Sequence, residues 1–182
     1  GGPLPVLGTS PIAMAVPDGV GGVAFQFDFS TSAVALGKIT VAAAAGEMIP
    51  LGWAVDADGE PTTDPNAALE GSLVPAGGYK GYGIGLMVEV LASALTGSRL
   101  STEVPALKAP DGPPHDLGQF YLVVDPAAYS GEDFHAHIAA LASTIAGQAG
   151  ARLPGSVRIT ADRVDLEQET WDLVQGLAGG PG

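Results

Sequence analysis

The stretch VPAGGYKGYGIGLMVEVLASALTG, residues 74–97, carries the strongest fold signal in this sequence. Glycines precede Tyr79 and Lys80, and a long apolar run follows, which predicts a turn that opens into a helix buried in the middle of a domain. A helix N-terminus offers unpaired N–H groups and the positive end of a dipole. Glycine lets the backbone approach a ligand, so Lys80 at this turn predicts an anion site. A plain tight turn explains the same residues, and the spacing leaves both interpretations open.

The composition excludes several classes of partner. The 182 residues fit one folded domain and carry a net charge of −13, so the cations needed to neutralise a row of phosphates are missing and we expect no nucleic-acid partner. An anionic membrane surface is disfavoured for the same reason, and no apolar run is long enough to span a bilayer. The absence of cysteine excludes disulfides, thiolate metal sites and a cysteine nucleophile within this sequence. We therefore expect a cytoplasmic protein with a packed core.

Hydrophobic periodicity predicts interleaved strands and helices. We expect strands within 5–16, over 22–29 and over 118–125, and helices over 33–45, after Lys80, after 130–133 and near the C-terminus. Residues 151–160 are typical of a strand or an extended loop, and residues 53–64 are typical of a turn-rich loop. The interleaving predicts an α/β fold. Ser30, Thr31 or Ser32 is the expected cap of the helix over 33–45.

Sequence motifs for common cofactors and metals are missing. The spacing around Lys80 fits neither a P-loop nor the G-x-G-x-x-G fingerprint. The DADG run at 56–59 lacks the glycine position and the final glutamate of a calcium loop, so we interpret it as a solvated turn. His135 and His137 are two residues apart on an expected helix and point in different directions, so we expect no metal site. His115 lies beside Asp116, which is compatible with a general base and equally with an exposed loop histidine.

Asp28, Ser30 and Thr31 lie where an expected strand gives way to an expected helix. Ligands of α/β proteins bind at such junctions, and polar residues there also cap helices. Both interpretations remain open from the residues alone.

Several ordered motifs resemble one family of oxidoreductases. They are LGTSPIA (7–13), FDFSTSAVALGK (27–38), IPLGWAVDADGEPTTDP (49–65) and residues 74–97, followed in order by GQFYLVVDP (118–126) and RLPG (152–155). Together they resemble the malate/L-lactate dehydrogenase family of NAD(P)-dependent enzymes, which includes sulfolactate, ureidoglycolate and diketogulonate enzymes and imine reductases. The resemblance covers essentially the whole chain. It implies a family-specific NAD(P)-binding fold, with a largely antiparallel or mixed sheet and flanking helices, that is not a Rossmann fold.

The resemblance also implies roles for particular residues. A cofactor, NAD or NADP, would contact Thr9, Asp28, Ser30, Thr31, Tyr79, Lys80 and Gly155. Asp56 would help to orient the acid/base group, and a small 2-hydroxy or 2-oxo acid would exchange hydride with the nicotinamide at C2. Two positions depart from the family pattern: Ser10 stands for the asparagine of G-T-N-P, and Ser156 for an acidic residue after L-P-G. A 2′-phosphate favours a nearby arginine, and only Arg99, Arg152, Arg158 and Arg163 are present, so the choice between NAD and NADP stays open.

Family members carry an N-terminal region that supplies a catalytic histidine and an arginine for the substrate carboxylate. Nothing precedes Gly1 here, so we expect a fragment whose proton-transfer histidine lies outside this chain and which has little activity alone. Residues 1–160 would form the NAD(P)-binding domain, and residues 161–182 a C-terminal helical segment packed on the missing region. We expect the intact enzyme to be a homodimer. The alternative is a non-catalytic remnant that acts as a binding or assembly module.

Overall fold

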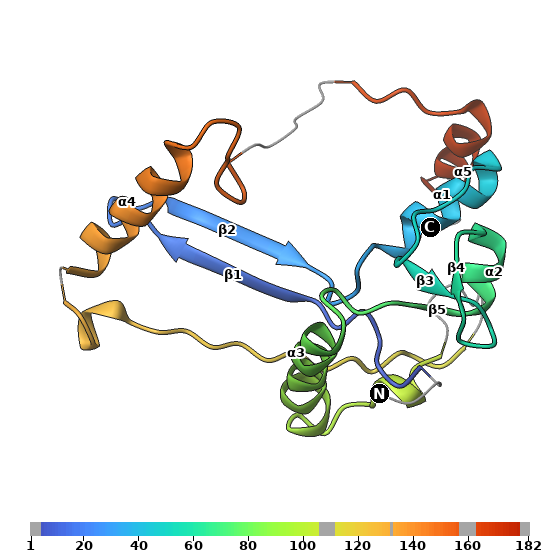
Figure 1. Ribbon diagram of the computed structural model, residues 1–182, viewed down its shortest axis with the longest axis horizontal. Coiled ribbons are helices and arrows are strands. Elements are labelled where there is room, and N and C mark those ends of the chain that lie inside the picture. The colour runs from blue at the N-terminus through green and yellow to red at the C-terminus, as the bar shows by residue number, and fades with distance from the viewer. Residues whose placement is uncertain (1–4, 106–111, 132, 157–162, 179–182) are drawn as a thin grey trace.

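The structure is a computed structural model, and it describes residues 5–105, 112–131, 133–156 and 163–178 (Figure 1). Strands and helices alternate in the order β1 (Ile12–Pro17), β2 (Val23–Phe29), α1 (Leu36–Ala45), β3 (Ala54–Val55), β4 (Pro61–Thr62), α2 (Pro65–Glu70), β5 (Ser72–Leu73), α3 (Tyr79–Glu89), η1 (Val90–Ala94), η2 (Ser101–Glu103), η3 (Pro126–Ala128), α4 (Asp133–Ala146) and α5 (Gln168–Ala178). The strands form small antiparallel sheets, one of two strands and one of three. This mixture confirms the α/β class.

β1 and β2 are the two strands expected within 5–16 and over 22–29, and they pair as an antiparallel hairpin with Ile12 opposite Phe29. Side chains two residues apart in a strand share a face, and the rings of Phe27 and Phe29 stack with their centroids 5.1 Å apart. Helix α4 packs against β2 near the far end of the hairpin (Figure 1). The predicted helix after residues 130–133 is therefore present and lies at the turn end of the hairpin.

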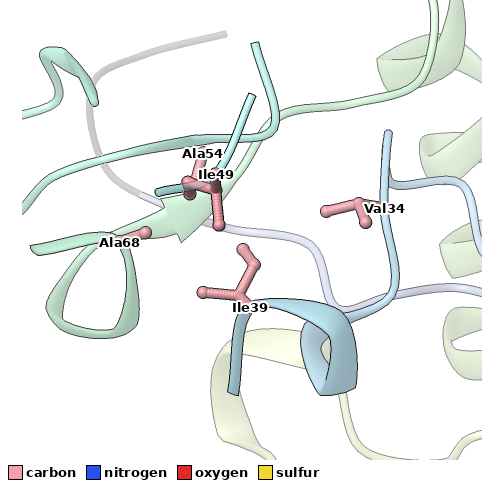
Figure 2. Packing of buried hydrophobic residues seen from close by; sticks show 5 residues of the cluster. All are labelled: Val34, Ile39, Ile49, Ala54 and Ala68. Carbon is pink, nitrogen blue, oxygen red and sulfur yellow. The ribbon is translucent and has the colours of Figure 1, made fainter. Parts of the chain in front are cut away.

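The hydrophobic core lies between α1, α2 and the small sheet β4–β3–β5. Its buried members come from four separate stretches of sequence and converge in space (Figure 2), namely Val34, Ile39, Ile49, Ala54 and Ala68. Ile39 is fully buried, and removing such a side chain from water contributes about 1.5–3 kcal/mol. Gly46 ends α1 in the left-handed conformation, with φ of 67°, as its position in the sequence predicts.

The start of α1 differs from the prediction. Its N-cap is Ala35, and no side chain caps the helix. The Ser32 hydroxyl donates instead to the Val34 carbonyl at 2.8 Å, and the Ser30 and Ser32 hydroxyl oxygens are 2.8 Å apart. These serines therefore stabilise the bend that precedes α1. Their hydroxyl groups bond to each other and to a nearby carbonyl instead of to the N–H groups at the start of the helix.

The segment 53–64 was expected to be a loop, and it contains the short antiparallel pair β3 and β4. Its last residue, Asp64, begins α2: the carboxylate accepts a hydrogen bond from the Asn66 N–H at 2.9 Å, and Pro65 occupies the first turn. An aspartate followed by proline is favoured both in turns and at helix starts, which explains the ambiguity of the sequence here.

Helix α3 is present, but its predicted burial is wrong for the part of the chain that the structure describes. Only Gly81 and Gly85 of α3 are buried, while Ile84, Met87 and Leu86 are exposed by about two fifths or more. Gly81 and Gly85 lie at the closest approaches of α3 to other described residues, Ala76, Leu7 and Thr31, where the missing side chain lets the backbone come close. The large apolar side chains consequently point away from these contacts.

The strand expected over 118–125 is also absent. These residues form an extended run that pairs with no described strand, visible in yellow in Figure 1. Tyr121, Leu122 and Val123 are exposed, Val123 by 92%. Alternating apolar residues predict a strand only if a second strand lies alongside, and the described residues provide none.

Helix α5 confirms the helix expected near the C-terminus. The predicted domain boundary at residue 160 falls among residues 157–162, outside the described residues, and the packing of residues 161–182 stays a prediction. No helix in the described ranges has the length and apolar character needed to cross a membrane.

Candidate functional site

Thr31 joins three segments that are distant in the sequence. It is 7% exposed, and both its N–H and its hydroxyl donate to the Thr9 carbonyl, at 2.9 and 3.2 Å. Its own carbonyl accepts from the Ala76 N–H at 2.9 Å, while the Ala33 N–H donates to the Val74 carbonyl at 2.7 Å. The segments before β1, after β2 and after β5 are thereby held side by side in an extended arrangement.

A cavity of about 520 Å³ opens beside this junction. Its walls come from the segment before β1, the two residues Thr31 and Ser32, the segment around β5 and the first turn of α3. Thr9 and Tyr79 line it together with Thr31, so the structure brings three of the predicted cofactor residues to one cavity. Leu7 and Val74 contribute apolar surface to the same walls.

The first turn of α3 leaves its backbone accessible at this cavity. Gly77 and Gly78 adopt φ of 69° and 64°, values that glycine tolerates and other residues rarely adopt, and nothing lies within 4 Å of the space that a Cβ would occupy. The first N–H groups of a helix have no acceptor inside the helix. Gly78, Tyr79 and Gly81 line the cavity, and the Gly78 N–H already donates to the Pro75 carbonyl at 3.1 Å. The N–H groups of Tyr79 and Gly81 are therefore the donors that this end of α3 can offer to an anion there.

Lys80 lies beside the cavity mouth without lining it. Its side chain is exposed and forms no ion pair with any residue that the structure describes. Its neighbour Tyr79 is 81% exposed although it lines the cavity. A flexible lysine at this position can reach an anionic group that extends out of the cavity, at little structural cost.

Asp28 and Gly155 line a different cavity, of about 680 Å³, beside β1 and β2. Gly155 packs on Gln26: φ is 77°, and a Cβ there would lie 2.7 Å from the Gln26 Cγ. The Gln26 N–H donates to the Pro154 carbonyl at 3.2 Å, which holds the two segments together. Five of the seven predicted cofactor residues therefore divide between two cavities, and Ser30 and Lys80 line neither.

Ser30 lies between the two groups. Its hydroxyl is paired with that of Ser32, which lines the first cavity. The chain bends at Thr31, shortly after β2 ends. Asp28 lies within β2 and lines the second cavity, whereas Thr31 and Ser32, after the strand, line the first.

Asp56 closes its own turn. One carboxylate oxygen accepts hydrogen bonds from the N–H groups of Asp58 and Glu60, at 3.0 and 2.9 Å. Val55 and Gly59 line the first cavity, whereas Asp56 does not. The turn confirms the solvated-turn interpretation, and the orienting role of Asp56 stays a prediction.

Two lining residues, Ser32 and Tyr82, were missed by the sequence reasoning. Tyr82 lies three residues after Tyr79, and residues at that spacing share a face of a helix, so the spacing was a usable signal. Ser32 gave no such signal, because its neighbours fit a helix cap equally well.

None of the three histidines lines either cavity. His135 of α4 packs against Gly19 in the β1–β2 turn, where its Nδ1 is buried and has no hydrogen-bond partner. The Nε2 atom of His115 is likewise buried and without a partner. Among the described residues, no cluster of three or more His, Asp and Glu side chains could hold a metal ion.

Ser10 adopts φ of 38°, a left-handed conformation that asparagine tolerates better than serine. This backbone geometry gives a physical reason for the asparagine that the resembling family commonly has at this position. The hydroxyl of Ser10 lies 3.4 Å from the Gly8 carbonyl, a long hydrogen bond within the same turn. The substitution of serine therefore keeps the turn polar at some conformational cost.

Residues 1–176 match the sequence profile of a family described as malate/L-lactate dehydrogenase. A (2R)-3-sulfolactate dehydrogenase (NADP(+)) of Chromohalobacter salexigens is 46% identical over 158 residues, which cover 87% of this chain and 47% of that protein. A Delta(1)-pyrroline-2-carboxylate reductase of Ancylobacter novellus is 43% identical over 164 residues, covering 88% of this chain and 48% of that protein. The chain thus spans about half the length of these curated relatives.

Solved structures show the same similarity. Sulfolactate dehydrogenase from Methanocaldococcus jannaschii superposes with a TM-score of 0.75 at 30% identity, over 95% of this chain and 52% of that one. The delta1-piperideine-2-carboxylate reductase of Pseudomonas syringae superposes with a TM-score of 0.71 at 35% identity, over 93% of this chain and 48% of that one. The described arrangement of strands and helices therefore occurs in enzymes with these two names.

Proposed function

The chain belongs to the malate/L-lactate dehydrogenase family, and we propose that it carries the cofactor-binding part of an NAD(P)-dependent oxidoreductase. The reaction proposed is hydride transfer between the nicotinamide and C2 of a small 2-hydroxy or 2-oxo acid, or of a cyclic 2-imino acid. The observation that supports it best is the cavity at the start of α3, where Thr9, Thr31 and Tyr79 meet accessible backbone N–H groups.

The residues around this cavity fit the chemistry of a nicotinamide nucleotide. Phosphate oxygens suit the first turn of α3, where Gly77 and Gly78 keep the backbone open and Lys80 supplies a cation. The hydroxyls of Thr9 and Ser32 can bond to ribose or amide groups. Bound there, the cofactor supplies the hydride, and the chain's own residues bind it and orient it.

The remaining predicted contacts belong to the same proposal. Asp28 and Gly155, in the second cavity, are proposed to meet a further part of the same extended cofactor, with Ser30 between the two cavities. The described arginines Arg99, Arg152 and Arg163 line neither cavity, so the described residues favour neither NAD nor NADP.

The proton that accompanies the hydride needs a donor of its own. The His115, His135 and His137 side chains lie outside both cavities, which supports our proposal that this donor is a histidine outside these 182 residues. Asp56, close to the first cavity through Val55, is proposed to help orient that group once the site is complete.

The names of the relatives suggest two kinds of substrate. One relative is named for a 2-hydroxy acid and the other for a cyclic imine that carries a carboxylate on the reacting carbon. Both kinds accept hydride at a carbon next to a carboxylate, so we propose a substrate of this general form. We further propose a cytoplasmic homodimer, because the apolar faces of α3 and of residues 118–124 are exposed and a subunit contact would bury them.

A titration tests the proposal directly. The full natural chain that contains these residues should bind NADH or NADPH at micromolar concentrations, followed by nucleotide fluorescence, and should oxidise it when given pyruvate, oxaloacetate, sulfopyruvate or Delta(1)-pyrroline-2-carboxylate. Binding without turnover of any of these acids would support the alternative, a binding module that has lost its chemistry. Failure to bind either nucleotide at millimolar concentrations would refute the proposed function.

A further inference from the structure

Glu89 is the acidic residue of α3, and both oxygens of its carboxylate accept hydrogen bonds from one residue, Ser101. Oε1 accepts a hydrogen bond from the Ser101 N–H at 2.6 Å, and Oε2 accepts one from the Ser101 hydroxyl at 2.6 Å. A carboxylate offers acceptors only, and bonds of this kind are about twice as strong as those between neutral groups. Glu89 therefore fixes both the backbone of Ser101 and the direction of its hydroxyl.

Glu89 is also the last residue before a change in helical geometry. The chain continues into the π-helical turn η1, in which the Leu95 N–H donates to the Val90 carbonyl at 2.8 Å, five residues earlier. Such turns are rare and occur frequently at functional sites, because the extra residue shifts the direction in which the following side chains point. The two hydrogen bonds of Glu89 tie this end of α3 to η2, twelve residues later.

Ser101 in turn lies against the wall of the cavity. A Cβ placed on Gly8 would lie 3.3 Å from the Ser101 Oγ, so Ser101 is the residue that faces Gly8, and Gly8 lines the cavity next to Thr9. The Thr9 carbonyl accepts both hydrogen bonds from Thr31. A continuous set of contacts therefore leads from Glu89 through Ser101 and Gly8 to the residues proposed to meet the cofactor.

We propose that Glu89 is a positioning residue for this cavity: it holds Ser101 against Gly8 and thereby sets where Thr9 and its carbonyl lie. Glu89 does not line the cavity, so it acts on a ligand only through these intermediates. The identity of the ligand rests on the proposed function. The positioning of Thr9 by Glu89 through Ser101 and Gly8 does not depend on it. Loss of the Glu89–Ser101 contact loosens the wall at Thr9 and weakens binding.

The test compares Glu89→Gln and Ser101→Ala with Glu103→Gln in the full natural chain. Ser101 uses a different oxygen of Glu89 for each hydrogen bond. Glutamine removes the negative charge and replaces one of these oxygens with an NH2 donor, so the pair of hydrogen bonds cannot form in this geometry. Glu103 is the matched control, because its carboxylate accepts from the Leu100 N–H at 2.9 Å in the same turn and makes no contact with Gly8 in the described contacts. Ser101→Thr retains the hydroxyl and tests for rescue if Glu89→Gln folds poorly.

Two readouts separate the proposal from the proposed function. The first is hydrogen exchange of the Thr31 amide, measured without nucleotide, which we expect to become several-fold faster in Glu89→Gln and Ser101→Ala and to stay at the parent rate in Glu103→Gln. The second is the Kd for NADH or NADPH, expected to rise about tenfold in the first two variants and less than twofold in the control and in Ser101→Thr, a tenfold change being about 1.4 kcal/mol.

Unchanged exchange at Thr31 in both Glu89→Gln and Ser101→Ala overturns the positioning role, whatever the nucleotide affinity. An equal effect of Glu103→Gln overturns it as well, because any weakening of the η2 turn would then be sufficient. If the parent chain binds neither nucleotide, the proposed function fails, and the exchange measurement still decides the role of Glu89.

Discussion

The Thr9 carbonyl oxygen accepts two hydrogen bonds from Thr31, one from its N–H at 2.9 Å and one from its hydroxyl at 3.2 Å. Both residues line the cavity at the start of α3, although 22 positions separate them in the chain. This double contact determines how the segments on either side of the β1–β2 hairpin close on the cavity, and it can be tested with conservative substitutions.

Thr31→Val keeps the shape of the side chain and removes its hydroxyl. We expect a loss of about 0.5–1.5 kcal/mol in the free energy of unfolding, because one of the two hydrogen bonds to Thr9 disappears from a buried site. Urea unfolding measures this change. Thr31→Ser, which retains the hydroxyl, controls for side-chain size, and a Thr31→Val variant as stable as the parent chain would contradict the structural role of the bond.

Gly81 and Gly83 provide a matched pair within α3. A Cβ at Gly81 would overlap the Ala76 carbonyl oxygen, whereas one at Gly83 meets nothing within 4 Å. We expect Gly81→Ala to destabilise the fold by about 1–3 kcal/mol through overpacking. Gly83→Ala should instead stabilise it by up to about 1 kcal/mol, because alanine favours helix interiors over glycine. Thermal unfolding monitored by circular dichroism distinguishes the two, and similar effects of both variants would contradict the close approach of α3.

Lys80→Gln tests the anion site at the start of α3. Removal of the cation should raise the Kd for the nucleotide about tenfold, equivalent to about 1.4 kcal/mol, and should flatten the dependence of binding on salt concentration. The control is Lys38→Gln, since Lys38 is an exposed lysine on α1 that lines neither cavity. Equal affinities of the Lys80 variant and the parent chain would indicate that the backbone N–H groups alone hold the anion.

Asp18 gives the hairpin turn a predictable pH dependence. Hydrogen bonds from the N–H groups of Val20 and Gly22, at 2.9 and 2.8 Å, hold the pKa of the Asp18 carboxyl below its ordinary value of 3.8. A carboxyl whose pKa is lowered by folding stabilises the folded state above its ordinary pKa. That contribution decreases as the pH falls through 3.8 and is lost below the lowered value.

Asp18→Asn removes this contribution while keeping an acceptor oxygen. The stability difference between the parent chain and Asp18→Asn should be constant above about pH 5 and shrink towards zero under more acidic conditions. Urea unfolding across this range measures it, with Asp58→Asn as the control for loss of one negative charge. A stability difference that grows on acidification would contradict a lowered pKa of Asp18 in the folded state.

Local periodicity was sufficient for much of the fold. The strands β1 and β2 and the helices α1, α4 and α5 all occur where the sequence predicts them, because the spacing of apolar residues, the glycine after α1 and the polar turns are properties of short stretches. The predictions failed where an element depends on a neighbour. Residues 118–125 have the alternation of a strand, and α3 has the composition of a buried helix, yet both expose apolar side chains in the described structure.

The candidate site likewise has features that the sequence predicts and features that only the tertiary structure decides. Glycines before Lys80 predict an anion site, which stays a prediction. The nicotinamide cofactor follows from a resemblance carried by motifs along the whole chain, and the relatives support it. Only the tertiary structure brings Thr9, Thr31 and Tyr79 to one cavity and sends Asp28 and Gly155 to another. Hydrogen bonds between segments far apart in the chain, such as those from Thr31 to the Thr9 carbonyl, decide which residues meet, and no local pattern shows them.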